Sequence, residues 1–329
     1  LDIEEIATSE VTTRDIDRGK FEHYLWKEIN EAPRSFEATI QGKIVKENNT
    51  FELNVPEDIL PENIVNKIQD GSIKKVLVIG QGTAAVAGQA CAHFFNVFNT
   101  SLEVKSVLAT EVSGFALHED MSSYLIIAVS QSGTTTDTNR TVDLLRNRGA
   151  SVIAIVNRRG SDLATKSDGV FYTSSGRDVE MSVASTKAFY SQVAAGSILA
   201  IAINDILQPG LIQQPKTQNL LESLINLPEL MRKTLKTREH ISNIAKRTVL
   251  SRRSWATVGN GPNTISAREI RIKSSELCYK AIANDVTEDK KHIDLSCEPL
   301  IVVCATGLNG STADDVSKEV SIFTAHKAV

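Results

Sequence analysis

The chain has 329 residues, of which 41% are hydrophobic and 23% are charged, and its formal net charge is −4. This composition is typical of a globular protein of about two domains. Acidic and basic residues are intermixed, so the charge pattern gives no argument for a nucleic-acid partner or an anionic membrane. We expect no membrane-spanning segment, because no apolar run approaches the ~20 residues required, and no signal peptide opens the chain. A cytoplasmic protein is expected.

Cysteine usage and the ends of the chain add two expectations. The four cysteines form no CxxC pair and are expected to be buried, reduced thiols: Cys91, Cys278, Cys297 and Cys304. Neither they nor the histidines show metal-ligand spacing, so we expect no metal and no cofactor. The chain begins with Leu1 and stops within an expected helix, which favours a fragment of a longer protein.

The first 45 residues are expected to form a linker followed by a helix. Apolar residues share one helical face between positions 21 and 29, and Pro33 is expected to interrupt the helix or begin a new turn. After it, "TFELNVP" predicts a short strand and "PENIVNKIQDGS" predicts a helix.

From Lys75 onward, short apolar runs alternate with amphipathic segments. The runs lie at 75–80, 103–110, 124–130, 151–157 and 170–175, and helices are expected near 84–97, 136–148 and 186–205. Short strands that are apolar on both faces are typical of a parallel sheet covered by helices. Residues 46–210 are therefore predicted to form a doubly wound, flavodoxin-like α/β domain, which binds ligands at the carboxyl ends of its strands.

Residues 211–329 are expected to form a second domain. Two helices are followed by "SWATVGNG", a strand running into a Gly-rich turn, then by a helix, the strand "EPLIVVCATG" and a further helix. This order repeats the opening of the first domain, so we interpret it as an internal repeat whose second copy is incomplete.

The Gly-rich turn "GQGTAAVAG" resembles a dinucleotide-binding fingerprint only in part. Gly80 and Gly82 follow a strand, but Ala85 stands where the third glycine belongs. The next acid, Glu103, begins the following strand instead of ending it. A nicotinamide site is therefore disfavoured, and a triphosphate-binding P-loop is not indicated because GxxxxGK[ST] is absent.

The loop "SQSGTTTDT" at 130–138 predicts a phosphate site. A helix start offers unpaired N–H groups and the positive end of the helix dipole to an anion. Ser130, Ser132 and Thr135 can add O–H donors, and Gly133 lets the backbone approach. The alternative is a simple N-cap by Thr136 or Asp137, which needs fewer hydroxyls. A second hydroxyl-rich segment, "SVASTKAFYSQ", opens the last crossover helix. Two interpretations stay open: Ser185 and Thr186 only cap this helix, or its start faces the same crevice as residues 130–135.

"SQSGTTTDT" and, some fifty residues later, "VASTKAF" resemble the sugar isomerase (SIS) domains of the glutamine–fructose-6-phosphate aminotransferase family. "FEHYLWKEINEAP" resembles the segment that joins the glutaminase domain of this family to its isomerase half. The resemblance covers most of the chain from about residue 15 to residue 305. It implies two SIS domains that bind fructose 6-phosphate and make glucosamine 6-phosphate with ammonia. It also implies a homodimer and a glutaminase domain that supplies the ammonia and is missing from this chain.

The resemblance also implies roles for particular residues. The phosphate would be held by Ser130, Gln131, Ser132 and Thr135, and the sugar would be lined by Thr83, Val183, Ala184 and Ser185. "RIKSSEL" places Lys273 and Glu276 three residues apart, as in the family, and His292 follows Glu276 at the family's spacing for the group that opens the sugar ring.

General chemistry fits these roles without requiring them. A partly desolvated carboxylate such as Glu276 can carry a proton between two carbons, and a histidine titrates near neutrality. The residues alone equally allow a surface ion pair between Lys273 and Glu276 and a solvated His292.

The chain departs from the family at three places. Ala84 replaces a hydroxyl residue, His292-Ile293-Asp294 replaces His-Gly-Pro, and residues 281–291 are charged where the family is small and apolar. Two alternatives therefore stay open: a phosphosugar deglycase or isomerase without glutaminase, and a sugar-phosphate sensor without catalysis.

Overall fold

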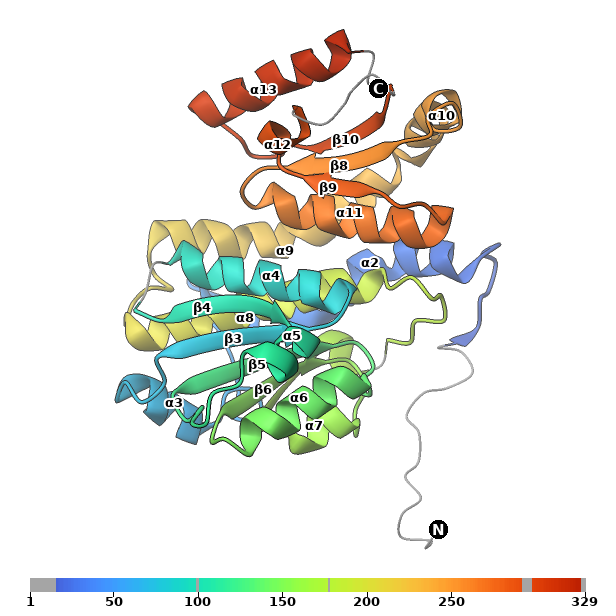
Figure 1. The fold of residues 1–329 in the computed structure, drawn as a ribbon. Coiled ribbons are helices and arrows are strands. Elements are labelled where there is room, and N and C mark those ends of the chain that lie inside the picture. Colours follow the sequence, from blue (N-terminus) through green and yellow to red (C-terminus); the bar gives the residue numbers. More distant parts are fainter. Residues whose placement is uncertain (1–15, 99–100, 177, 292–297, 327–329) are drawn as a thin grey trace, which may run out of the picture. The chain divides into compact units, whose positions relative to one another are not determined.

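The computed structural model describes residues 16–98, 101–176, 178–291 and 298–326. Contacts along the chain divide it into two compact units, Leu1–Arg232 and Lys233–Val329. Figure 1 shows the helices and strands of each unit, and each unit is treated by itself.

The first unit contains a five-stranded parallel sheet. Its strands are β3 (Lys75–Gly80), β4 (Glu103–Leu108), β5 (Tyr124–Ser130), β6 (Ser151–Val156) and β7 (Gly169–Tyr172), in the spatial order β4-β3-β5-β6-β7. Every pairing is parallel. The predicted doubly wound α/β fold is confirmed.

Helices cover both faces of this sheet, as the apolar character of its strands predicts. One face packs on α2 (Tyr24–Ile40), α3 (Glu62–Gln69), α4 (Thr83–Val97) and α8 (Lys187–Leu207). The other packs on α5 (Ala109–Phe115), α6 (Thr136–Arg146) and α7 (Asp162–Lys166). Along β3 the side chains alternate, so that Val78 faces the first layer and Ile79 the second.

Helix α8 forms the centre of the first layer. Its residues are mostly Ala, Ile and Leu, and by length and composition it could cross a membrane, contrary to our expectation that no run is that apolar. However, 67% of its most apolar window is buried inside the protein. Packing against α2 and α4 explains the apolar sequence.

The N-terminal part of the first unit adds helix α2 and a two-stranded antiparallel hairpin of β1 (Ile44–Glu47) and β2 (Thr50–Leu53). Strand β2 and helix α3 match the predictions from "TFELNVP" and "PENIVNKIQDGS". The expected break at Pro33 is wrong, because α2 continues through this residue. The apolar face that α2 buries outweighs the one backbone hydrogen bond that proline cannot donate.

The second unit has a three-stranded parallel sheet in the order β10-β8-β9. Its strands are β8 (Trp255–Gly259), β9 (Ala283–Asp285) and β10 (Leu300–Cys304), accompanied by α10 (Arg238–Thr248), α11 (Asn263–Cys278), α12 (Thr287–Lys291) and α13 (Gly310–Ala325). Helix α9 (Pro215–Leu235) runs across the division between the units.

The strand–turn–helix that opens each sheet has the same backbone plan. Gly80 and Gly259 end β3 and β8, and a Cβ on either would overlap the backbone of the following helix. Two residues later, Gly82 and Gly261 have φ values of +54° and +55°, which favour glycine. The repeated turn supports our interpretation of an internal repeat.

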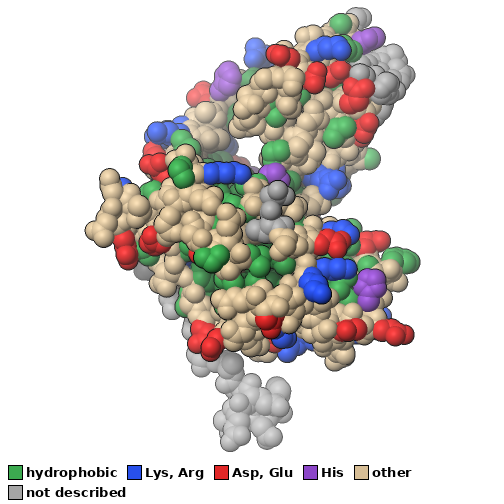
Figure 2. All heavy atoms as spheres, turned by 90° about the vertical axis from the view of Figure 1, so that its left-hand side faces the viewer, with side chains coloured by type: hydrophobic (Ala, Val, Ile, Leu, Met, Phe, Trp, Pro, Cys, Tyr) green, Lys and Arg blue, Asp and Glu red, His purple; other side chains and the backbone are tan. Residues whose placement is uncertain are grey.

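Several short elements escaped the sequence prediction. The run at 103–110 was expected to be a strand throughout, but β4 ends at Leu108 and α5 begins at Ala109. Helices α7 and α12 and strand β9 have only three to five residues, too few for periodicity to be read. On the face drawn in Figure 2, acidic and basic side chains of the described residues are interspersed rather than grouped by sign.

Candidate functional site

The strand order of the first unit places a topological switch point between β3 and β5. After β3 the chain turns to β4 on one side and then returns to β5 on the other. Ligands of doubly wound sheets bind in the crevice at such a point, outside the carboxyl ends of the strands. Two of the predicted site residues border this point: Ser130 ends β5, and Thr83 begins α4, which follows the turn after β3.

The loop after β5 is held in shape by its own hydroxyls and backbone. The Ser130 hydroxyl oxygen accepts the backbone N–H of Gly133 at 3.0 Å and lies 3.3 Å from the hydroxyl of Thr135. Gly133 has a φ of +66°, and a Cβ there would overlap the side chain of Ser161. The buried amide of Asn139 donates to the carbonyls of Gly133 and Thr135 at 3.0 and 3.1 Å.

This loop leaves the start of α6 without a side-chain cap. The N-cap residue is Thr135, whose hydroxyl makes no capping hydrogen bond. The alternative of a cap by Thr136 or Asp137 does not apply, because both residues lie within the helix. The Thr134 hydroxyl donates to Ser132 at 2.9 Å. Ser130, Gln131, Ser132 and Thr135 are thus brought together at a helix start, an arrangement that can bind an anion through hydroxyl and backbone donors.

The loop after β3 brings Thr83 to the other side of the switch point. Thr83 is the first residue of α4 and is 9% exposed. A Cβ on Gly80 would lie 2.9 Å from the backbone carbon of Ala84, so only glycine lets α4 begin this close to the strand.

The segment before α8 positions Val183, Ala184 and Ser185 differently. The Val183 side chain is 98% exposed, whereas Ala184 is buried. The Ser185 hydroxyl donates to the carboxylate of Glu180 at 2.7 Å. The possible cap by Ser185 or Thr186 is not what the structure has, because Glu180 accepts the backbone N–H groups of Thr186 and Ala188 instead.

Glu180 and its buried neighbour Glu28 were not indicated by the sequence. Glu28 accepts hydrogen bonds from the backbone N–H groups of Met181 and Ser182 and from the Ser182 hydroxyl. Burial raises the pKa of the Glu180 carboxyl above its ordinary value, and the charge of Glu28 adds to the rise, against the hydrogen bonds that lower it. Local capping rules consider the residue at the helix start, which is Thr186, and therefore do not indicate Glu180.

In the second unit, Lys273 and Glu276 pair on α11 at 2.9 Å, and Lys273 also lies 3.7 Å from Glu269. The Glu276 side chain is 42% exposed. The expected juxtaposition of these two side chains is present, and by itself it is also that of a surface ion pair. His292 lies outside the described residues.

The cysteines differ in exposure, contrary to our expectation for all four. Cys91 is buried, and burial raises its pKa to about 12. Cys278 is exposed because it ends α11, and Cys304 is intermediate. Cys297 lies outside the described residues. Among the described residues, no group of three His, Cys, Asp or Glu side chains is arranged to hold a metal ion.

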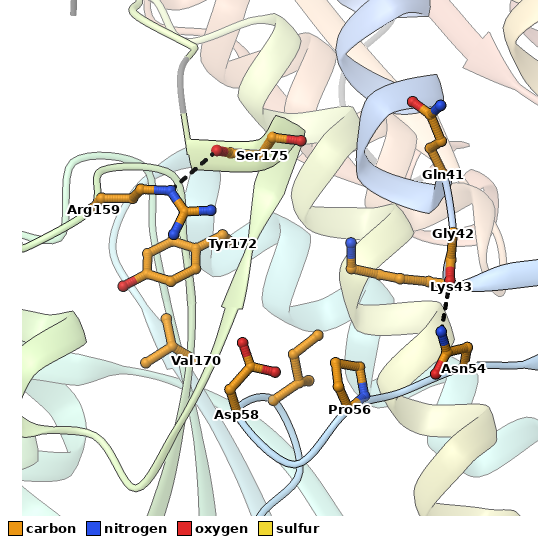
Figure 3. A pocket seen from close by; sticks show the side chains of 11 residues that line it. Gln41, Gly42, Lys43, Asn54, Pro56, Asp58, Arg159, Val170, Tyr172 and Ser175 are labelled. Atoms are coloured by element: carbon orange, nitrogen blue, oxygen red, sulfur yellow. Dashed lines mark hydrogen bonds between the residues drawn. The ribbon is translucent and has the colours of Figure 1, made fainter. Parts of the chain in front are cut away.

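A cavity of about 230 Å³ lies elsewhere in the first unit, beside β7 (Figure 3). Within it the Arg159 guanidinium stacks 4.5 Å from the centre of the Tyr172 ring and donates to the carbonyl of Ser175. Burial lowers the pKa of Lys43, and the charge of Asp58 opposes that shift. None of the residues singled out by the sequence lines this cavity.

The sequence pattern of the SIS domain family matches residues 72–202, which include every strand of the first sheet and both loops at its switch point. Residues 72–202 are therefore a SIS domain. The similarity to curated proteins extends beyond this segment.

The curated relatives are glutamine–fructose-6-phosphate aminotransferases. That of Clostridium tetani is 29% identical over 265 residues, covering 80% of this chain and 41% of its own length. That of Arabidopsis thaliana is 27% identical over 290 residues, covering 87% and 41%. The chain thus spans about two fifths of the length of these relatives.

Among solved structures, the C-terminal domain of the Francisella tularensis glucosamine-fructose-6-phosphate aminotransferase has the same fold. Its TM-score is 0.79 at 22% identity, covering 95% of this chain and 83% of that domain. The glucosamine-6-phosphate deaminase of Thermotoga maritima also has this fold, with a TM-score of 0.67 at 18% identity, covering 93% of this chain and 83% of that one.

Proposed function

We propose that this chain is the sugar-phosphate isomerase part of a glutamine-dependent fructose-6-phosphate aminotransferase. It would bind fructose 6-phosphate and, with ammonia from a glutaminase domain, yield glucosamine 6-phosphate. The names of the curated relatives support the reaction. The observation that carries the proposal is the hydroxyl-rich, uncapped start of α6 at the switch point of the sheet.

The phosphate of the substrate would sit on the loop after β5. Ser130, Gln131, Ser132 and Thr135 converge there, and neutral donors with a helix dipole suffice to hold an anion. The carbon chain would then extend past Thr83 toward Val183, Ala184 and Ser185. Ala84 leaves one family hydroxyl absent at this end.

For the chemistry, Glu276 would move a proton between C1 and C2 after ammonia has condensed with the C2 carbonyl and water has left. Lys273, 2.9 Å from Glu276, would stabilise the charge that develops on the sugar. His292 would open the ring. We further propose that residues 211–329 are an incomplete second SIS domain and that the protein is a cytoplasmic homodimer.

Thermal unfolding with added ligands tests the binding half of this proposal. Fructose 6-phosphate and glucosamine 6-phosphate should raise the melting temperature, fructose should not, and inorganic phosphate should act more weakly. A ligand at a hundred times its Kd adds about 2.7 kcal/mol of stability. A melting temperature that no hexose phosphate raises would contradict the proposal. Formation of glucosamine 6-phosphate by the full-length protein from fructose 6-phosphate and glutamine tests the remaining half.

A further inference from the structure

We propose that Glu180 is a positioning residue that sets which ligand groups the sugar end of the site accepts. The inference rests on the proposed function and deepens it. It concerns the loop of residues 178–186, which leads from the sheet into α8. Two carboxylates hold this loop: the half-buried Glu180 within it, and the buried Glu28 of α2. Together they accept hydrogen bonds from Met181, Ser182, Ser185 and Thr186.

The first carboxylate fixes the end of the loop. Glu180 accepts the Ser185 hydroxyl at 2.7 Å, the backbone N–H of Thr186 at 2.7 Å and that of Ala188 at 3.2 Å. It thereby caps α8 with a charge of its own. The starts of α6 and α8 therefore differ: the first has no side-chain cap, and the second already holds an anion.

The second carboxylate fixes the beginning of the loop. Glu28 is 1% exposed and accepts two backbone N–H groups and one hydroxyl from Met181 and Ser182. Two further ties come from α2. Lys187 of α8 lies 2.7 Å from Glu31, and the Ser35 hydroxyl donates to Asp178. The loop is thus fastened on both sides before any ligand arrives.

These contacts determine whether the Ser185 hydroxyl donates or accepts a hydrogen bond when a ligand binds. Because its single hydroxyl proton is given to Glu180, its oxygen offers only lone pairs to a ligand. Such an oxygen accepts a hydrogen bond from a sugar hydroxyl and cannot donate one to a phosphate oxygen. The carboxylate beside it repels an anion as well. A hexose phosphate is therefore bound in one direction, with its phosphate on α6 and a hydroxyl group on Ser185.

The experiment measures the affinities of this chain for fructose 6-phosphate and for inorganic phosphate in four proteins: wild type, Glu180→Gln, Ser185→Ala and the double variant. Glu180→Gln keeps the shape of the side chain but removes the charge. We expect it to weaken fructose 6-phosphate binding about tenfold, as the loss of a bond to a charged group does. Inorganic phosphate binding should change less than about twofold, since the α6 loop is untouched. Glu222→Gln, on the exposed face of α9, is the matched control.

The double variant separates positioning from a general loss of stability. If Glu180 acts through Ser185, the two substitutions together should weaken fructose 6-phosphate binding no more than the stronger one alone. Additive losses, or equal losses for both ligands, would overturn the inference. Should Glu180→Gln not fold, Glu180→Asp, which keeps the charge but shortens its reach, takes its place in the same cycle.

Failure of the proposed function gives a different pattern. In that case wild type would bind no hexose phosphate at all. Wild-type binding of fructose 6-phosphate that Glu180→Gln leaves unchanged would overturn the positioning role alone.

Discussion

The hydroxyl oxygen of Ser130 accepts the backbone N–H of Gly133 at 3.0 Å, and this bond folds the loop after β5 back toward its own strand. The bond uses a lone pair of Ser130 and leaves its proton available. As a result, the hydroxyls that follow are gathered at the start of α6 rather than spread along the surface.

Replacing Ser132 or Thr135 with alanine should weaken fructose 6-phosphate binding by about 1–3 kcal/mol each, the usual cost of losing a hydrogen bond to a charged group. Calorimetric titration of each variant measures the change. Thr136→Ala, an exposed hydroxyl within α6, serves as the control and should bind as wild type does. Unchanged affinity for fructose 6-phosphate in both the Ser132 and the Thr135 variant would contradict phosphate binding by this loop.

Gly133→Ala should destabilise the first unit more than Gly160→Ala. Both glycines have a positive φ, +66° and +62°, which costs about 1–2 kcal/mol for alanine. Only at Gly133 does the added Cβ meet a neighbour, the side chain of Ser161, while nothing lies within 4 Å at Gly160. Urea unfolding of the two variants isolates the steric part. Equal losses of unfolding free energy in the two variants would show that a Cβ at position 133 fits beside Ser161, contrary to the structure.

Glu276→Gln in the full-length protein should leave sugar-phosphate binding intact and stop the exchange of the C1 proton with solvent. Gln keeps the size of the side chain but cannot serve as a base, and the loss of a general base costs on the order of 10²–10⁴ in rate. Proton NMR in deuterated water follows the exchange. Wild-type exchange in the variant would return Glu276 and Lys273 to the status of a surface ion pair.

Glu180 should make the protein less stable as the pH rises above 4.5. Its pKa is raised in the folded state from the ordinary 4.5, chiefly by burial and then by the charge of Glu28, so the folded protein binds the proton more tightly than the unfolded chain does. The stability gained from that proton is fully present below pH 4.5 and is lost as the pH rises through the raised pKa.

The stability difference between wild type and Glu180→Gln should therefore shrink from pH 4.5 to pH 7.5 in urea unfolding. Other charged groups on the neighbouring elements, namely Glu28, Lys187, Glu31 and Asp178, are the same in both proteins, so the comparison isolates the carboxyl group of Glu180. A stability difference that grows with pH would mean that the hydrogen bonds from Ser185, Thr186 and Ala188, which lower the pKa of Glu180, outweigh the burial that raises it.

Cys278 should react with a thiol reagent in the folded protein, whereas Cys91 should react only after unfolding. Cys278 is exposed at the end of α11, while Cys91 is buried and has a pKa raised to about 12, so it offers no thiolate near neutral pH. Mass spectrometry of peptides after timed labelling identifies each site. Rapid labelling of Cys91 would indicate that α4 opens away from α8.

The sequence predicts the first sheet almost completely because its central strands, β3, β5 and β6, are short apolar runs that are buried on both faces. It also predicts the hydroxyl loop, since the residues of that loop lie together in the chain. It could not predict the hydrogen bond from the Ser182 hydroxyl to the carboxylate of Glu28, because the two residues are 154 positions apart in the chain. Such a pair leaves no local pattern. Likewise Pro33 misled the prediction, because local rules do not register the burial of α2.

Helix α2 is synthesised early and α8 late, yet the two share a buried contact between Ser35 and Ser191, 156 residues apart. This contact between α2 and α8 can form only after α8 has emerged from the ribosome. Until then the face of the sheet that α8 covers stays exposed to water. Contacts between segments so far apart in the chain also form slowly, because a long loop must close. The first unit should thus complete its folding only once α8 has been synthesised, and an intermediate whose apolar sheet face is uncovered is expected to bind chaperones until then.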